Sequence, residues 1–134
     1  MTAPVVDCSV TMAWVLRDES SALAESALDQ VTAHGAVAPT LWWVEVRNVL
    51  LTAERRGRLT PEDTSLALAA IEALGIRLDH APDGGALLRL ARAHRLTAYD
   101  AMYLELSIRQ QRPLATLDHR LSTAAQVEGL ELAF

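Results

Sequence analysis

The sequence contains no lysine: all 12 of its basic residues are arginine. This absence excludes enzymes that depend on a lysine. A P-loop nucleotidase, for example, needs the lysine of its Gly-Lys-Ser/Thr motif to reach the phosphates, and no such motif is present. Cysteine is almost as scarce, since Cys8 is the only one. A lone thiol cannot form an internal disulfide, which favours a reducing, cytoplasmic location.

Zinc ligands and long apolar runs are also missing. One cysteine and four histidines without ligand spacing argue against a zinc site. No apolar run approaches the ~20 residues that a membrane-spanning helix needs, so we expect no membrane attachment. The first residues bring no basic segment and Asp7 interrupts the apolar run that follows, so we expect no signal peptide. The length of 134 residues predicts one domain over residues 1–134.

The net charge of −5 does not favour nucleic-acid binding, which needs local positive charge. The distribution of the arginines matters more than the sum. Two groups are close together in the sequence: Arg55, Arg56 and Arg58, and Arg89, Arg92 and Arg95. The planar guanidinium fork suits phosphate, so either group is a candidate contact to a nucleic-acid backbone. The alternative is a solvated helix face.

Short apolar segments alternate with helical patterns along the chain. We expect strands at 4–8, 36–38, 76–78, 114–117 and 130–134, and helices at 10–17, 20–34, 40–56, 60–74, 84–94, 97–111 and 119–127. Thr40, Thr60 and Thr97 are the expected caps of three of these helices. This alternation predicts an α/β fold in which a parallel sheet is covered on both faces. Within the third helix, Trp42 and Trp43 point ~100° apart, so one of the two should be less buried.

Four acidic residues lie where acids do little for folding. Asp7 follows the apolar run Pro4-Val5-Val6, and Asp118 follows Leu114-Ala115-Thr116-Leu117. Glu45 interrupts an apolar helix, and Asp100 is in the first turn of another. An open α/β sheet gathers ligands at the carboxyl ends of its strands. Carboxylates brought together there repel one another unless a cation lies between them. Hard oxygen ligands select Mg²⁺ or Mn²⁺, so the sequence predicts a metal-dependent enzyme acting on phosphate esters.

Each acid also has a structural interpretation. Asp7 can end a strand and turn the chain, and Glu45 can lie on the surface of an amphipathic helix. Asp100 lies three residues after Thr97, close to a capping box, and Asp118 can cap the helix at 119–127. A carboxylate in a first turn can cap a helix and bind metal at once, so the two interpretations are compatible.

Four segments together resemble the PIN-domain nucleases, and among them the VapC toxins of toxin–antitoxin pairs. The segments are Val5-Val6-Asp7-Cys8-Ser9, Glu45 with Asn48, Tyr99-Asp100-Ala101-Met102-Tyr103-Leu104, and Ala115-Thr116-Leu117-Asp118-His119-Arg120-Leu121. Each is a weak signal alone, but their order and spacing match over nearly the whole chain.

The resemblance implies a three-layer α/β/α fold and Mg²⁺- or Mn²⁺-dependent cleavage of RNA. It implies that the catalytic and metal-binding residues are Asp7, Glu45, Asp100 and Asp118, with Ser9, Asn48 and Thr116 in support. It also implies a cognate antitoxin protein as partner. The hydrophobic fraction of 51% and the tryptophans on two helices indicate more apolar helix surface than a monomer of this size needs, so we expect a homodimer, and the resemblance points the same way. Arg55, Arg56 and Arg58 are the candidate RNA contacts.

Three other interpretations apply to the same acids. A receiver domain also gathers acids at strand ends, but it uses a lysine near its last strands. A haloacid-dehalogenase-like phosphohydrolase needs a second aspartate two residues after the nucleophile, whereas Ser9 follows Asp7 at that spacing, and it normally uses a lysine. A PIN-like module that binds without catalysis stays open, although retention of all four acids argues against it.

Overall fold

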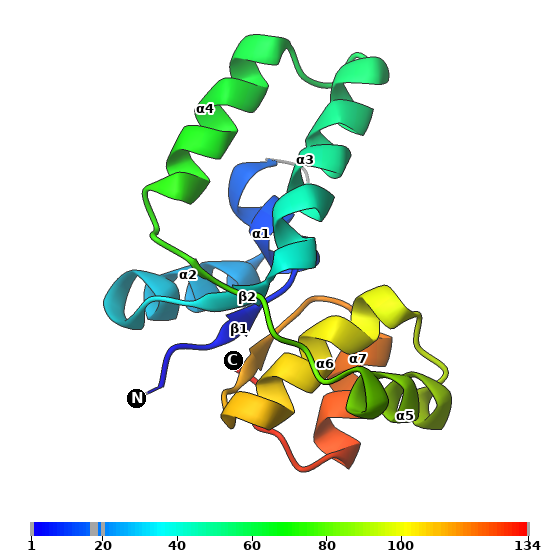
Figure 1. Ribbon diagram of the computed structural model, residues 1–134. Helices are drawn as coiled ribbons and strands as arrows, with labels where there is room; N and C mark the ends of the chain where they lie inside the picture. The colour runs from blue at the N-terminus through cyan, green and yellow to red at the C-terminus, as the bar shows by residue number, and fades with distance from the viewer. Residues whose placement is uncertain (1, 17–18, 20, 134) are drawn as a thin grey trace.

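The computed structural model describes residues 2–16, 19 and 21–133, and Figure 1 shows its arrangement of helices and strands. The strands are β1 (Val5–Val6), β2 (Val37–Pro39), β3 (Arg77–Asp79) and β4 (Leu114–Ala115). The helices are α1 (Cys8–Val15), α2 (Ala22–His34), α3 (Thr40–Arg55), α4 (Pro61–Glu72), α5 (Gly84–His94), α6 (Ala98–Gln110) and α7 (His119–Val127). The predicted α/β class is therefore confirmed, with each strand shorter than the sequence suggested or displaced by one residue.

The sheet is parallel throughout its described part, with strand order β3-β2-β1-β4. Val5 pairs with Val37 of β2 on one side and with Leu114 of β4 on the other. These three side chains are fully or almost fully buried. A strand buried on both faces needs apolar residues at every position, which explains why Val5–Val6 and Leu114–Ala115 show no alternation. All four strands end at the same edge of the sheet.

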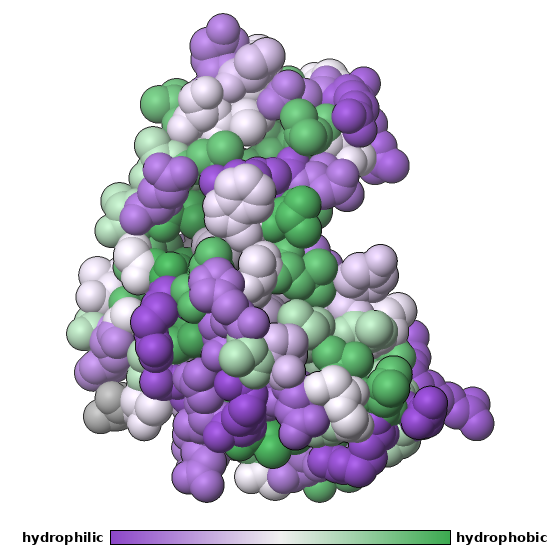
Figure 2. Space-filling model, viewed as in Figure 1, coloured by the Kyte–Doolittle hydropathy of each residue, from purple (hydrophilic) through white to green (hydrophobic). Residues whose placement is uncertain are grey.

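Helices cover both faces of this sheet, giving the three-layer architecture. On one face α6 packs against β1, β2 and β4, and α5 and α7 pack against α6. On the other face α1 packs against α2 and α3 (Figure 1). Helices α3 and α4 form an antiparallel pair that extends beyond the sheet. Figure 2 shows a hollow in the molecular surface between this pair and the N-terminal end of α6.

Several predicted details differ from the structure. Thr40 does not cap α3: the N-cap is Pro39, and the Thr40 hydroxyl instead donates to the Asp79 carbonyl at 3.0 Å. The predicted last strand is reduced to a single parallel bridge between Leu132 and Leu114. Phe134 at its end lies outside the described residues. So do Arg17 and Ser20, where two predicted helices end and begin.

Trp42 and Trp43 differ in burial, as their angular separation predicts. Trp42 is 5% exposed and packs in the core, whereas Trp43 is 48% exposed. The Arg47 guanidinium lies 3.7 Å from the centre of the Trp43 ring, so the guanidinium covers one face of this exposed ring. None of the described helices combines the length and the apolar character that crossing a membrane would require.

A buried charge network joins the edge strand β3 to α6. Glu105 of α6 is only 2% exposed and accepts a hydrogen bond from Arg109 Nε at 2.7 Å. Arg109 Nη2 donates to Asp79 Oδ2 at 2.6 Å, so one guanidinium bridges the two carboxylates. The guanidinium holds the pKa of Asp79 below its ordinary value. This network fixes β3, the strand that leads from the α3–α4 pair back to the lower helices.

We predict that Arg109→Met destabilises the protein by about 2–3 kcal/mol, because it leaves the Glu105 carboxylate buried without its cation. The value is at the low end for a broken buried pair since Arg109 itself is partly exposed. Urea denaturation at neutral pH measures it. The control is Arg92→Met, which removes an exposed arginine from α5. Equal losses in the two variants would contradict the role assigned to the network.

Candidate acidic active site

Asp7 is the most deeply buried of the four candidate acids, at 5% exposure. It follows β1 directly and is the N-cap of α1, accepting the Val10 amide at 3.0 Å through Oδ1. The Ser9 hydroxyl also donates to Oδ1, at 2.7 Å, and the Thr116 hydroxyl donates to Oδ2. Three donors from β1–α1 and from the end of β4 therefore hold one carboxylate in place.

Burial dominates the electrostatics of Asp7. It raises the pKa of this carboxyl from 3.8 to about 6, although the hydrogen bonds from Thr116, Ser9 and Val10 all oppose the rise. The negative charge of Asp118 adds to it. Desolvation disfavours the charged form, and the hydroxyl donors only partly compensate. A cation next to Asp7 would stabilise its charged form and lower its pKa.

The two hydroxyls that hold Asp7 also organise the end of β4. Ser9 Oγ accepts the Leu117 amide and Thr116 Oγ1 accepts the Asp118 amide, each at 3.0 Å. Each hydroxyl therefore donates to Asp7 and accepts from the backbone that follows β4. Ser9 and Thr116 fix the position of Asp118 relative to Asp7.

Asp118 caps α7, as its position in the sequence suggests. Its Oδ1 accepts the amides of Arg120 at 2.9 Å and Leu121 at 3.4 Å. Its charge nevertheless acts on the other acids, because it raises the pKa values of both Asp7 and Asp100. The capping role and the electrostatic role coexist in one carboxylate.

Asp100 lies in the first turn of α6, where its amide donates to the capping Thr97 hydroxyl at 3.1 Å. Partial burial is the main cause of its raised pKa, and Asp118 is the second. Arg120 lowers that pKa, so its guanidinium is close enough to attract the carboxylate. The guanidinium is itself held by a hydrogen bond from Nη2 to the Arg95 carbonyl at 2.5 Å.

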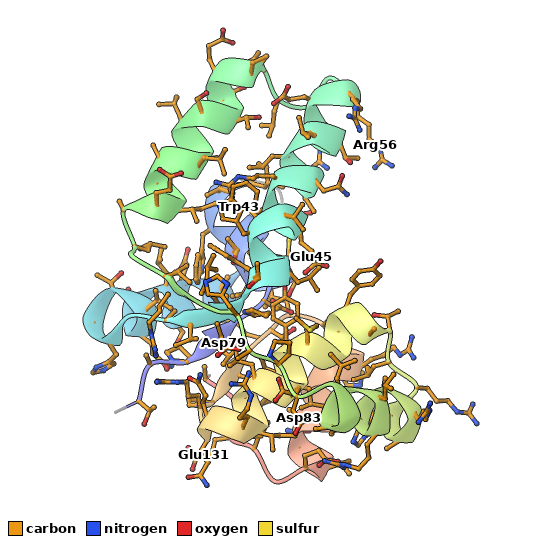
Figure 3. The ribbon with its side chains drawn as sticks, viewed as in Figure 1. Trp43, Glu45, Arg56, Asp79, Asp83 and Glu131 are labelled. Atoms are coloured by element: carbon orange, nitrogen blue, oxygen red, sulfur yellow. The ribbon has the colours of Figure 1, made fainter. Side chains whose placement is uncertain are left out.

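Glu45 comes from α3 and points toward the hollow in the surface (Figure 3). The buried Tyr103 of α6 donates its hydroxyl to Glu45 Oε1. Partial burial raises the pKa of Glu45, and the charge of Asp100 raises it further. The helix that carries Glu45 is anchored behind the site, where Trp42 Nε1 donates to the Thr11 hydroxyl at 2.9 Å. That hydroxyl in turn donates to the Asp7 carbonyl at 2.8 Å.

The four acids form one electrostatically connected set. Asp118 acts on Asp7 and Asp100, and Asp100 acts on Glu45. The Cys8 thiol lies among them, and its pKa is raised to about 12, first by burial and then by the charges of Glu45 and Asp7. The four segments that the sequence singled out therefore come together in space at the strand ends.

The acids do not form a compact cage. Within residues 2–16, 19 and 21–133, no three His, Cys, Asp or Glu side chains are close enough together to enclose a metal ion. Mutual repulsion keeps unneutralised carboxylates apart, and the Asp7 oxygens are held by hydroxyls. The donor chemistry still fits Mg²⁺, since this ion keeps several waters and needs only one or two carboxylates directly. The site fits a hydrated hard cation better than a dehydrated one.

The supporting residues divide into two groups. Ser9 and Thr116 contact Asp7, as described. Asn48 is exposed on α3, one turn after Glu45, and lines a pocket of about 230 Å³ together with Arg56 and Arg58. Arg56 lies roughly 16 Å from Glu45 along the axis of α3, at about 1.5 Å per residue. The arginines are therefore at the far end of this helix, away from the acids (Figure 3).

Two residues of the site were not singled out from the sequence. Tyr103 holds Glu45, and Arg120 is a cation beside Asp100. Both belong to segments that resemble the PIN family, yet neither a tyrosine on an apolar helix nor an arginine after an N-cap signals such a role. The contact of Tyr103 spans 58 residues of sequence, so only the fold shows it.

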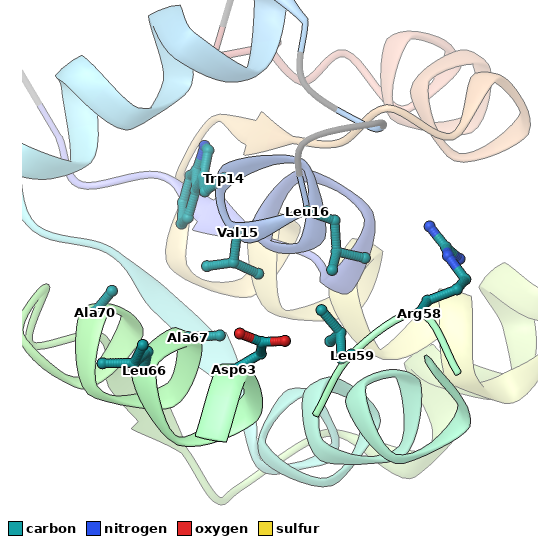
Figure 4. A pocket seen from close by; sticks show the side chains of 9 residues that line it. All are labelled: Trp14, Val15, Leu16, Arg58, Leu59, Asp63, Leu66, Ala67 and Ala70. Carbon is teal, nitrogen blue, oxygen red and sulfur yellow. The ribbon is translucent and has the colours of Figure 1, made fainter. Parts of the chain in front are cut away.

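A larger pocket than the one beside Asn48 lies elsewhere. It has a volume of about 700 Å³ and lies between α1, α4 and the loop before α4 (Figure 4). Its walls are mainly apolar, with Trp14, Val15, Leu59 and Leu66 among them, and none of the four acids lines it. It is therefore distinct from the acidic site.

Comparison with known proteins agrees with this geometry. A family model described as PIN domain matches residues 5–127. The crystal structure of PAE2754 from Pyrobaculum aerophilum is similar, with a TM-score of 0.73 and 22% sequence identity, over 92% of this chain and 84% of that chain. At this identity the likeness shows the fold alone. No curated protein matches the sequence.

The raised pKa of Asp7 makes stability depend on pH when no metal is present. Below pH 3.8 the native and unfolded states both carry the proton. Between 3.8 and about 6 only the native state keeps it, so the free energy of unfolding falls as pH rises and stays lower above that window. The shift corresponds to up to about 3 kcal/mol.

We predict that Asp7→Asn removes this loss, because asparagine caps a helix almost as well and does not ionise. We compare the unfolding free energy of Asp7→Asn with that of the parent at each pH. Relative to the parent, the variant should gain up to about 3 kcal/mol of stability between about pH 4 and about pH 7. Urea denaturation in EDTA measures it. A difference that does not change with pH would show that Asp7 is not strained by burial.

Proposed function

The chain belongs to the PIN-domain family, and from this membership we propose that it is a metal-dependent endoribonuclease that hydrolyses RNA phosphodiester bonds. PIN domains are generally nucleases that use divalent metal ions, and PIN nucleases bind RNA. The observation that carries the proposal for this chain is the connected set of Asp7, Glu45, Asp100 and Asp118 at the strand ends. Asp7 and Asp118 also cap helices, but capping alone does not require four acids to lie close enough to raise one another's pKa values.

We propose that these four acids hold Mg²⁺ or Mn²⁺, directly or through water. When bound, such an ion lowers the pKa of its water ligand and stabilises negative charge on phosphoryl oxygens. Asp7 is the fixed member of the set, because Ser9 and Thr116 restrain both of its oxygens. Asp118 is positioned through the same hydroxyls, and Asp100 through the cap at Thr97. Arg120, close to Asp100, is a cation placed to attract a substrate phosphate.

The proposed RNA path runs along α3. Arg55, Arg56 and Arg58 lie at or just beyond the end of this helix, and Arg56 is roughly 16 Å from Glu45 along the helix axis. Contacts there would bind the phosphate backbone beyond the cleaved bond and would carry no sequence preference. Asn48 lies between the two ends of this path.

A second function is favoured by one observation, the absence of a compact metal cage in the described part of the chain. A PIN-like module that binds RNA without cleaving it would have no need of one. The haloacid-dehalogenase-like alternative receives no such support, because Ser9 holds Asp7 at the position where that chemistry needs an aspartate. A nuclease assay separates the three functions.

We predict that the parent protein cleaves single-stranded RNA in Mn²⁺ and not in EDTA. Asp100→Asn and Asp118→Asn should each lose on the order of a hundredfold or more in rate, since even outer-shell changes at metal sites cost up to that much. Both variants should keep their melting temperature in EDTA. At position 118 asparagine caps a helix almost as well as aspartate, and at position 100 the Thr97 cap stays in place.

The matched control is Asp29→Asn, which removes an exposed carboxylate from α2. It should cleave RNA at the parent rate. A parent protein that binds RNA but does not cleave it in Mn²⁺ would support the binding module instead. Parent-like cleavage by either site variant would make that aspartate a cap only.

We further propose that the protein is the toxin of a type II toxin–antitoxin pair, of the VapC type, acting as a homodimer in the cytoplasm. The support is the resemblance of the four segments, together with an apolar pocket of about 700 Å³ next to an exposed Leu66 (Figure 4). Such a pocket suits an apolar segment of a partner protein. The expected partner is the product of a short neighbouring gene with a DNA-binding fold.

We predict that this gene product co-purifies with the chain and abolishes its RNase activity. Leu66→Glu should weaken the complex by placing a charge in the pocket, whereas Leu88→Glu on α5, also an exposed leucine, should not. Light scattering should give twice the chain mass of 14.6 kDa for the protein alone. A monomer at every concentration tested would exclude the homodimer, and equal binding by both variants would exclude the pocket.

A further inference from the structure

Tyr103 is a buried tyrosine whose hydroxyl reaches a candidate catalytic acid. The side chain is 2% exposed and packs in the hydrophobic core, while its hydroxyl donates to Glu45 Oε1. The bond joins α6 to α3, and in the same view the molecular surface is hollowed between these two helices (Figures 1 and 2). It is therefore a direct connection across the candidate site.

Glu45 depends on this bond for its position. No other hydrogen bond to its side chain occurs among the described residues. Asp100 repels it, since the charge of Asp100 raises the pKa of Glu45. A free glutamate has three rotatable bonds and gains entropy by moving into water. Without Tyr103, repulsion and entropy would therefore both move Glu45 away from the other acids.

Asp7, Asp100 and Asp118 are positioned differently. Each follows or begins a regular element. The carboxylates of Asp7 and Asp118 accept backbone amides of the helices that they cap, and the Asp100 backbone amide donates to the Thr97 hydroxyl in the first turn of α6. Glu45 is the one member of the four that projects from the middle of a helix on a longer side chain. A contact from outside its own helix is what can orient it.

We propose that Tyr103 is a positioning residue that holds Glu45 toward the other three acids, so that Glu45 takes part in binding a divalent cation, directly or through water. This inference rests on the proposed function, because it assumes that the acids bind metal. A purely structural role makes a different prediction. If the bond only satisfies a buried phenol, its loss would change stability and leave metal affinity unchanged.

The test is Tyr103→Phe, which removes one oxygen and keeps the packed ring. Mn²⁺ binding is measured by isothermal titration calorimetry without RNA, so the readout does not depend on catalysis. We expect the dissociation constant to rise by about 10- to 100-fold, the usual effect of losing a group that orients a metal ligand. The matched control is Tyr99→Phe, which removes the same atom from an exposed position on the same helix and should bind Mn²⁺ like the parent.

A double-mutant cycle with Glu45→Gln identifies the route of the effect. If Tyr103 acts through Glu45, adding Tyr103→Phe to Glu45→Gln should change the affinity no further. Effects that multiply would show that Tyr103 acts by another route and would overturn the inference. Melting curves in EDTA confirm that each variant is folded before titration.

The outcomes separate this inference from the proposed function. Equal Mn²⁺ affinity of the parent and Tyr103→Phe overturns the positioning role and leaves the nuclease proposal intact. No Mn²⁺ binding by the parent overturns both. Weaker binding in Tyr103→Phe, with an unchanged Tyr99→Phe control and no added effect on Glu45→Gln, supports the inference.

Discussion

The structure depends on satisfying one buried carboxylate, Asp7. This group ends β1, begins α1 and receives hydroxyls from Ser9 and Thr116, so three elements meet at its two oxygens. The same hydroxyls accept backbone amides from the segment that leads to α7. If the carboxylate moved, the end of β4 and the start of α7 would lose their alignment with β1. The geometry of the candidate site follows from this one constraint.

The site lowers stability in order to concentrate negative charge. The pKa values of Asp7, Glu45 and Asp100 are all raised, and burial is the first cause in each case. A protein selected for stability alone would replace such groups, because the fold already has a large apolar core. The contrast with Glu105 is informative, since that buried acid is neutralised by Arg109. Arg109 therefore compensates a charge that supports the fold, whereas at the candidate site Arg120 acts on Asp100 and the pKa values of Asp7, Glu45 and Asp100 stay raised.

Much of this could be predicted from the sequence, because local rules decide it. The capping residues Thr60, Thr97 and Asp118 lie where their side chains begin helices, and the apolar runs give the buried strands. The juxtaposition of Asp7 and Asp118 follows from parallel strands ending at one edge, and the role of all four acids in metal binding stays a prediction. Local rules failed at Thr40. Threonine is a good cap residue, but the Thr40 hydroxyl donates to the Asp79 carbonyl of β3 and does not cap α3.

The part that could not be predicted is the position of Glu45 relative to the other acids. A helix pattern gives the side of α3 on which Glu45 lies but not the angle at which α3 meets the sheet. Two long-range contacts set that angle: Trp42 reaches Thr11 beside Asp7, and Tyr103 reaches Glu45 itself. Both partners lie on other helices. Trp42 precedes Glu45 by three residues, which is nearly one helical turn. The two hydrogen bonds therefore hold the same turn of α3, one to α1 and the other to α6. A site assembled from strand ends and one separate helix therefore needs such paired contacts, and changes in either should alter the site before they alter the fold.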